Sequence, residues 1–125
     1  MATQDKPNLV AIVDDDDSVR SALQGLMKEA GLPALAFASG EEFLRSGKHR
    51  QTACLIADIR MPGMSGLELQ ARLNEDRQRI PIIFITAHGD EDMRLRALRG
   101  GAVEFLAKPF DEEILLDSVR AALDS

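Results

Sequence analysis

The chain has little of what would direct it to a membrane, to nucleic acid or to an oxidising compartment. Its 125 residues include a single cysteine, Cys54, and no apolar run is long enough to cross a bilayer. Cys54 lies inside an apolar run, which favours a buried core thiol over a nucleophile or a metal ligand. A formal net charge of -6 argues against direct binding of nucleic acid, which needs a basic surface. The start, MATQDKPN, has no signal-peptide pattern. We therefore expect a cytoplasmic protein that contacts neither membrane nor nucleic acid directly.

What the chain does have is a regular alternation of short apolar runs and helical periods. The length suits one domain over residues 1–125. Short runs rich in apolar residues predict five strands, at 9–13, 34–37, 54–57, 82–86 and 103–107. A helical pattern follows each of them. Five strand–helix units predict an α/β domain in which helices cover both faces of a parallel sheet.

Polar side chains stand where four of these strands end. Asp14 and Asp15 follow the first strand, Asp58 the third, Thr86 the fourth and Lys108 the fifth. Because the carboxyl ends of parallel strands share one crevice, we expect these groups to converge. Three close carboxylates repel one another and favour a cation, and Mg²⁺ prefers oxygen ligands. A lysine and a hydroxyl beside them suit an anion, so the site indicates phosphoryl chemistry.

Each of these residues, taken alone, has an ordinary interpretation. Asp58 would be a cap or turn residue, Thr86 a strand residue and Lys108 a surface lysine. Their joint placement carries the hypothesis. With a metal beside it, Asp58 is either a ligand or a nucleophile that forms an acyl phosphate. A cis bond at Lys108–Pro109 would aim the lysine sharply.

Four segments, VDD (13–15), DIRMPGMSG (58–66), ITAH (85–88) and FLAKPF (105–110), resemble the receiver domain of response regulators, the phosphoacceptors of two-component signalling. TAHGD (86–90) is also similar to receivers of nitrogen-fixation and nitrate-type transcription factors. The resemblance implies a flavodoxin-like fold with sheet order 2-1-3-4-5. It also implies a signalling domain that phosphorylates and dephosphorylates itself, rather than an enzyme.

The resemblance further implies a role for each matching residue. Asp58 would accept a phosphoryl group from a sensor histidine kinase or a phosphotransfer protein. Mg²⁺ would be held by Asp14, Asp15, Asp58 and the backbone carbonyl of Arg60. Thr86 and Lys108 would stabilise the phosphoryl group, and Thr86 would act as a switch together with Phe105, which stands where many members have tyrosine.

The face formed by the fourth helix, the fifth strand and the fifth helix is the usual partner surface of the family. In the last helix, Ile114 and Leu116 flank the predicted core stripe, which is more apolar width than one buried face needs. Arg94, Arg96 and Arg99 in the preceding helix could meet Asp111, Glu112, Glu113 or Asp117 of a second copy. We therefore expect phosphorylation to act through this face, as a phosphorylation-dependent homodimer. The alternative is that these apolar groups fill groove edges and the charges are solvated.

Three other functions compete with this interpretation. An Mg²⁺-dependent phosphatase of the haloacid-dehalogenase type also uses an aspartate nucleophile, but it needs a second acid two residues later, where this chain has Arg60. A flavodoxin-like cofactor binder would carry a phosphate loop after the first strand, where this chain has four aspartates. A phosphorylation-independent binding module would not need every signature position intact.

Overall fold

Strands and helices alternate along the part of the chain that the computed structural model describes, residues 7–124. The strands are β1 (Leu9–Val13), β2 (Ala34–Phe37), β3 (Thr52–Asp58), β4 (Ile82–Thr86) and β5 (Glu104–Ala107). The helices are α1 (Asp17–Glu29), α2 (Gly40–Ser46), α3 (Gly66–Glu75), α4 (Glu91–Arg99) and α5 (Glu112–Leu123), with a 3-10 turn η1 (Lys48–Gln51) before β3.

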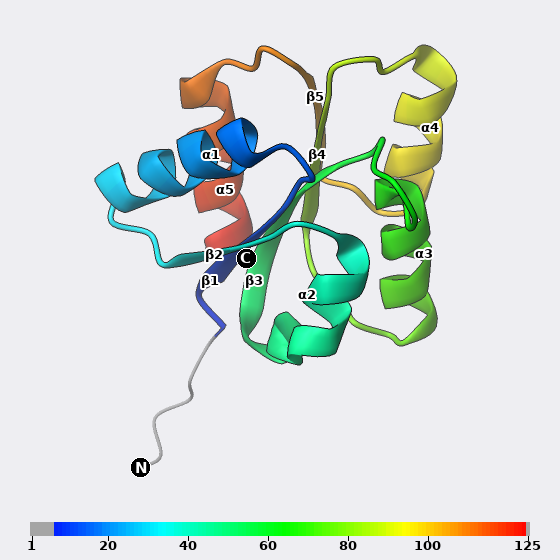
Figure 1. Ribbon diagram of the computed structural model, residues 1–125, viewed down its shortest axis with the longest axis horizontal. Helices are drawn as coiled ribbons and strands as arrows, with labels where there is room; N and C mark the ends of the chain where they lie inside the picture. Colours follow the sequence, from blue (N-terminus) through cyan, green and yellow to red (C-terminus); the bar gives the residue numbers. More distant parts are fainter. Residues whose placement is uncertain (1–6, 125) are drawn as a thin grey trace.

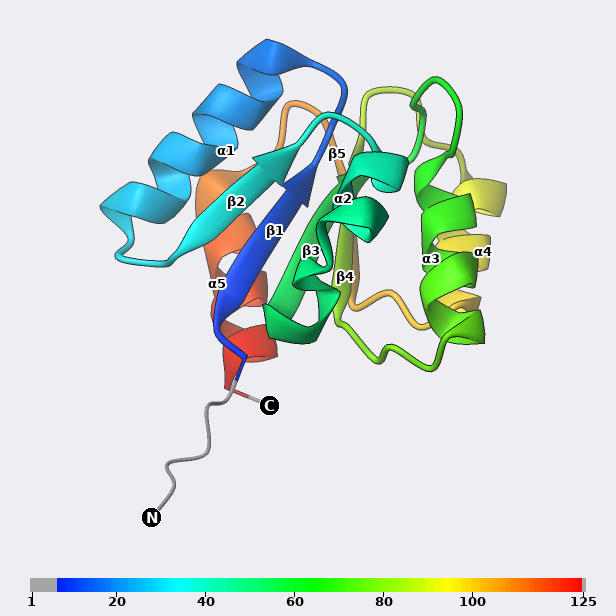
Figure 2. The ribbon, with the colours of Figure 1, turned by 60° about the horizontal axis from the view of Figure 1, so that its bottom comes forward.

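All neighbouring strands are parallel, and their order is β2-β1-β3-β4-β5. The predicted flavodoxin-like topology is therefore confirmed. Helices α1 and α5 cover one face of the sheet, and α2, α3 and α4 cover the other (Figures 1 and 2). Every strand consequently ends at the same edge, which places the loops after β1, β3, β4 and β5 together.

The core divides into two layers because successive strand residues point to opposite faces. Val10 and Ile12 pack in one layer with Leu23 of α1, whereas Ala11 and Val13 belong to the other layer. Cys54 is fully buried in the first layer, and this burial raises the pKa of its thiol to about 12. The prediction of a buried core thiol is confirmed.

Side-chain caps begin each α-helix at the edge where the strands end. An aspartate or serine oxygen accepts backbone N–H groups at every one of these starts, and the capping residues are Asp16, Ser39, Ser65, Asp90 and Asp111. These caps fix where each connecting loop stops, so the loops that carry the polar groups are short and anchored at both ends.

The strands differ from the predicted ones at two starts and one end, because β3 includes Asp58, which was expected to follow it. β3 begins at Thr52, two residues earlier than expected, and β5 begins at Glu104, one residue later. The turn η1 was not predicted, because its sequence KHRQ has no apolar periodicity. Among residues 7–124, no helix is long and apolar enough to cross a membrane.

Candidate functional site

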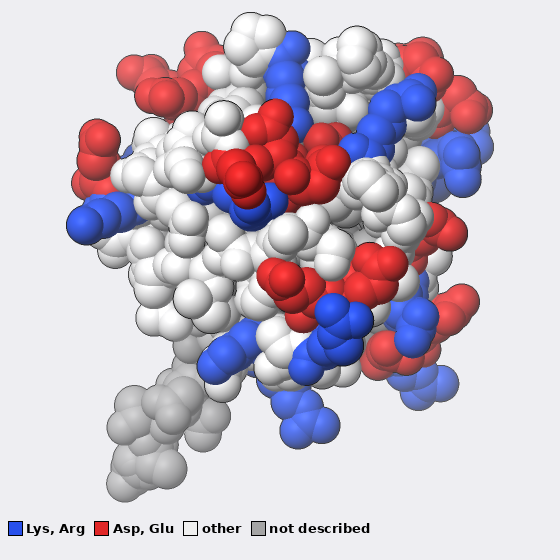
Figure 3. Space-filling model, in the orientation of Figure 1, with Lys and Arg blue, Asp and Glu red and all other residues white. Residues whose placement is uncertain are grey.

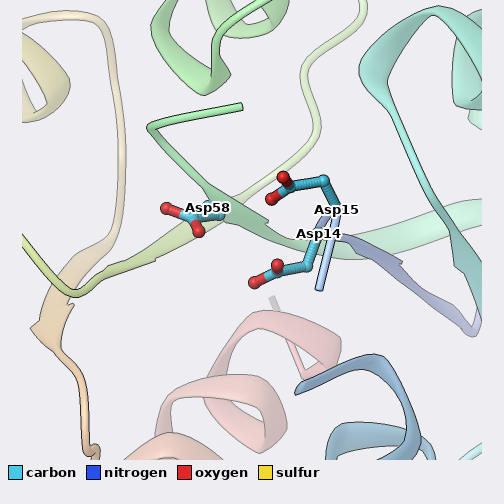
Figure 4. Close-up of side chains that lie close together, drawn as sticks. All are labelled: Asp14, Asp15 and Asp58. Carbon is cyan, nitrogen blue, oxygen red and sulfur yellow. The ribbon is translucent and has the colours of Figure 1, made fainter. Parts of the chain in front are cut away.

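Three carboxylates meet at the carboxyl edge of the sheet. Asp14 and Asp15 follow the last residue of β1, and Asp58 is the last residue of β3 (Figure 4). One oxygen of each lies within 4.8 Å of the others. Asp14 and Asp58 are buried, whereas Asp15 is exposed. The predicted convergence is therefore confirmed, and acidic side chains gather on this part of the surface (Figure 3).

Lys108 joins the two buried carboxylates. Its Nζ lies 2.9 Å from Asp14 Oδ2 and 2.9 Å from Asp58 Oδ2. Its backbone N–H donates to the carbonyl of Thr86, and its peptide bond to Pro109 is cis. The fifth strand thus brings a single cation to the acids, as the sequence predicted.

The ionisation of this cluster reflects burial opposed by pairing. Burial raises the pKa of Asp14, although the Asp16 amide and Lys108 partly offset the effect. Burial acts to lower the pKa of Lys108, but its hydrogen bonds to Asp58 and Asp14 outweigh this and raise it. The lysine therefore stays charged between the two carboxylates.

The loop after β3 folds back tightly on the end of that strand. The N–H of Arg60 donates to Asp58 Oδ1 at 3.2 Å, and the N–H of Gly66 donates to the carbonyl of Ile59 at 2.8 Å. A Cβ on Gly66 would lie 2.3 Å from the carbonyl oxygen of Asp58, so this close approach requires glycine. The Arg60 side chain crosses to the next loop, where its Nε donates to the carbonyl of His88 at 3.3 Å.

Thr86, the last residue of β4, is buried, and its hydroxyl has no hydrogen-bond partner among the described residues. Buried hydroxyls are normally paired, because an unpaired one keeps its full desolvation cost. A hydroxyl left without a partner at the end of β4 is free to bond a group that arrives there.

Gly89 brings Thr86 and Phe105 together. A Cβ on Gly89 would lie 2.7 Å from the Thr86 methyl and 2.9 Å from two atoms of the Phe105 ring. The two predicted switch residues therefore both lie against the backbone of residue 89, and only glycine at that position leaves room for both side chains. The sequence reasoning did not identify Gly89, although the glycine in TAHGD was a visible signal.

Arg20 is a second residue that the sequence reasoning missed. Its Nη1 donates to the backbone carbonyl of Asp14 at 2.6 Å, and its guanidinium also pairs with Asp17. Arg20 lies in α1, six residues beyond Asp14, and nothing in its local sequence distinguishes it from a solvated helix arginine. It holds the backbone of the loop after β1 in place.

The donor set fits Mg²⁺. Asp14, Asp15 and Asp58 offer only oxygen, which is the ligand type that hard divalent cations take, and Mg²⁺ often uses one or two carboxylates with waters and phosphate oxygens. The structure does not test the predicted participation of the Arg60 carbonyl, which stays a prediction. Lys108 lies beside these carboxylates, and the Thr86 hydroxyl has no partner among the described residues. Both are groups that suit an anion.

Comparison with known proteins agrees with this geometry. The family model described as "Response regulator receiver domain" matches residues 10–120. This chain belongs to the response regulator receiver family. Members of this family are signalling domains rather than enzymes in the usual sense, and the fold and the acidic pocket of this receiver domain agree with that membership.

The relatives of this receiver domain include transcription regulators. It is 48% identical over 116 residues to nodulation protein W of Bradyrhizobium diazoefficiens, covering 93% of this chain and 51% of that protein. It is 40% identical over 114 residues to the transcriptional regulatory protein FixJ of Azorhizobium caulinodans, covering 91% of this chain and 54% of that protein. These matches confirm the resemblance to the transcription-factor receivers.

A solved structure of the response regulator StyR superimposes with a TM-score of 0.86 at 48% identity, covering 93% of this chain and 59% of that one. The receiver domain thus spans about half the length of the curated relatives that it matches.

Proposed function

We propose that this domain accepts a phosphoryl group on Asp58 from a histidine kinase or a phosphotransfer protein. A carboxylate oxygen of Asp58 forms the new bond to phosphorus while the bond from phosphorus to the donor imidazole breaks, and the imidazole nitrogen then takes a proton from water. The observation that carries the proposal is the pairing of Asp58 with Lys108 beside Asp14 and Asp15.

Asp14, Asp15, Asp58 and the carbonyl of Arg60 would hold Mg²⁺. When bound, the cation neutralises charge on the transferring phosphoryl oxygens. Lys108 already lies 2.9 Å from Asp58 Oδ2, so it is placed to pair with a phosphoryl oxygen on that side. The acyl phosphate adds about −1.5 to −2 charge, which the Lys108 ammonium and the Thr86 hydroxyl then stabilise.

Thr86 and Phe105 would convert this local event into a change of surface. If the Thr86 hydroxyl moves to the phosphoryl group, the space beside Gly89 opens, and the Phe105 ring can fill it. Because packed cores hold discrete arrangements, the result is a shift between two populations rather than a gradual deformation.

The output surface in this proposal is the face of α4, β5 and α5, used for a phosphorylation-dependent homodimer. Exposed apolar side chains on this face include Leu98 (38%) and Ile114 (47%), whereas Leu116 is half-buried against the core. Arg94 already pairs with Glu91 of its own helix. Arg96 lines a hollow with the loop after β3 and with α3, so Arg99 is the arginine of α4 that is left to meet acidic groups of a second copy on this face.

Sedimentation with and without beryllofluoride, a phosphoryl mimic, tests the dimer. We expect self-association only with the mimic, and Leu98→Asp should abolish it. The control is Leu35→Asp, because Leu35 of β2 is similarly exposed (40%) but lies at the opposite edge of the sheet. A monomer in both states at high concentration would reject the dimer.

Intact-mass spectrometry after incubation with acetyl phosphate and Mg²⁺ tests phosphoryl transfer itself. The wild type should gain one phosphoryl group, and chelation of Mg²⁺ should prevent the gain. Asp58→Asn should not be labelled, whereas Asp76→Asn, at the exposed end of α3, should be labelled like the wild type. Full labelling of Asp58→Asn would refute the assignment.

A further inference from the structure

The loop that follows Asp58 is held by a residue from a distant part of the chain. Glu41, in the first turn of α2, accepts the backbone N–H of Met64 on its Oε2 at 3.2 Å. The two residues are 23 positions apart in the sequence. The start of α2 lies beside the loop between β3 and α3 in both ribbon views (Figures 1 and 2).

A glycine on each side of this contact leaves room for it. Gly63 has a left-handed φ of 74°, and a Cβ there would lie 2.8 Å from Glu41 Oε2. A Cβ on Gly40 would lie 3.1 Å from the sulfur of Met64. Glycine at both positions therefore allows the loop to lie directly against the helix, with the Glu41 carboxylate between them.

Other bonds fix the two ends of the loop, including the N–H of Ser65, which donates to Glu68 Oε1 at 2.9 Å. The Arg60 carbonyl lies in the stretch between these ends. Arg60 is tied to Asp58, and Gly66 is tied to Ile59. Between these anchors, Met64 N–H has the Glu41 carboxylate as its partner. The other carboxylate oxygen, Oε1, is buried without a hydrogen-bond partner among residues 7–124. Leaving this oxygen without a partner costs free energy, so the bond from Met64 is the one polar contact that offsets the partial burial of the Glu41 side chain among the described residues.

We infer that Glu41 is a positioning residue for the metal site: it acts through the loop to hold the Arg60 carbonyl where Mg²⁺ can use it. The inference rests on the proposed function. Residues that position metal ligands without contacting the metal themselves commonly lower the metal affinity by about 10- to 100-fold when they are removed. This role needs a side chain long enough to accept the Met64 N–H, and it does not need a negative charge. The test must therefore separate the effect of side-chain length from the effect of charge.

Isothermal titration calorimetry of Mg²⁺ binding to three variants makes that separation. Glu41→Gln keeps the reach and an acceptor oxygen but loses the charge, so its affinity should stay within about twofold of the wild type. Glu41→Asp keeps the charge but is too short, and Glu41→Ala lacks both, so each should bind Mg²⁺ about tenfold more weakly. Glu75→Ala, at the exposed end of α3, controls for loss of one negative charge.

The outcomes distinguish this inference from the proposed function. Equal Mg²⁺ affinity in all variants would overturn the positioning role, even if thermal stability fell. Weak binding by Glu41→Gln with normal binding by Glu41→Asp would also overturn it, because charge and not reach would then be acting. If Glu41→Ala does not fold, the Gln and Asp pair still decides. A wild type that binds no Mg²⁺ would instead refute the proposed metal site.

Discussion

Thr86→Val should have opposite effects on the free domain and on the phosphoryl-bound domain. Valine has nearly the shape of threonine but lacks the hydroxyl, which is buried without a partner in the described structure. An unsatisfied buried polar group costs about 1–3 kcal/mol, so removing it should stabilise the free domain by about 1–2 kcal/mol. For a domain of this size, each kcal/mol corresponds to about 4 °C in Tm.

In the bound state the same hydroxyl would donate to a charged group. Such hydrogen bonds contribute about 1.5–3 kcal/mol, so Thr86→Val should bind beryllofluoride roughly 10- to 100-fold more weakly. Thermal unfolding measures both the stability of the free domain and its affinity for beryllofluoride. It is run first without the mimic and then over a range of mimic concentrations at fixed Mg²⁺. The variant should therefore melt higher than the wild type without the mimic and gain less when it is added.

Thr52→Val is the matched control. Thr52 is also a buried threonine, but its hydroxyl donates to the carbonyl of Lys48 at 2.9 Å. Removing a satisfied hydroxyl and leaving its acceptor should lower the stability by about 0.5–1.5 kcal/mol without changing the response to beryllofluoride. A Thr86→Val protein that melts below the wild type, or that binds the mimic equally well, would refute the reasoning.

Three further outcomes follow from the site and the core. Pairing with the two carboxylates raises the pKa of Lys108, so the wild type should lose stability as the pH rises from the ordinary lysine pKa of about 10.4 through this raised value. Urea unfolding measured from about pH 9 to 11.5 should show this loss in the wild type but not in Lys108→Met. Identical pH profiles would contradict the pairing. Cys54, with its pKa raised to about 12 by burial, should resist a thiol reagent at about pH 8 until urea unfolds the chain, and rapid native labelling would contradict its burial. Gly89→Ala should destabilise the domain by about 1–3 kcal/mol through overpacking against Thr86 and Phe105, and an unchanged Tm would show that the space is not tight.

Much of this arrangement was predictable because the fold turns a linear pattern into a spatial one. Buried strands appear as continuous apolar runs, and parallel topology brings their ends to one edge, so Asp14, Asp58 and Lys108 could be expected to converge. The helix starts were also readable, since Asp90 and Asp111 have the short polar side chains that cap N-termini.

Residues that act through long-range packing left little trace in the sequence. Glu41 looks like an ordinary acidic residue in the first turn of a helix, which is favourable whatever it contacts. Its bond to Met64 depends on how α2 lies against the loop after β3, and no local periodicity encodes that. Gln70 is a similar case, because it is buried in α3 and donates to the carbonyl of Ala97 in α4.

Direct localisation of the phosphoryl group tests the central claim, that Asp58 is the acceptor in a site completed by Mg²⁺ and Lys108. After phosphorylation with acetyl phosphate and Mg²⁺, borohydride reduces an aspartyl phosphate to homoserine, which peptide mass spectrometry then locates. We predict homoserine at position 58 alone, in a reaction that chelation of Mg²⁺ prevents. Homoserine at Asp14 or Asp15 instead, or labelling that is unchanged without Mg²⁺, would contradict the account.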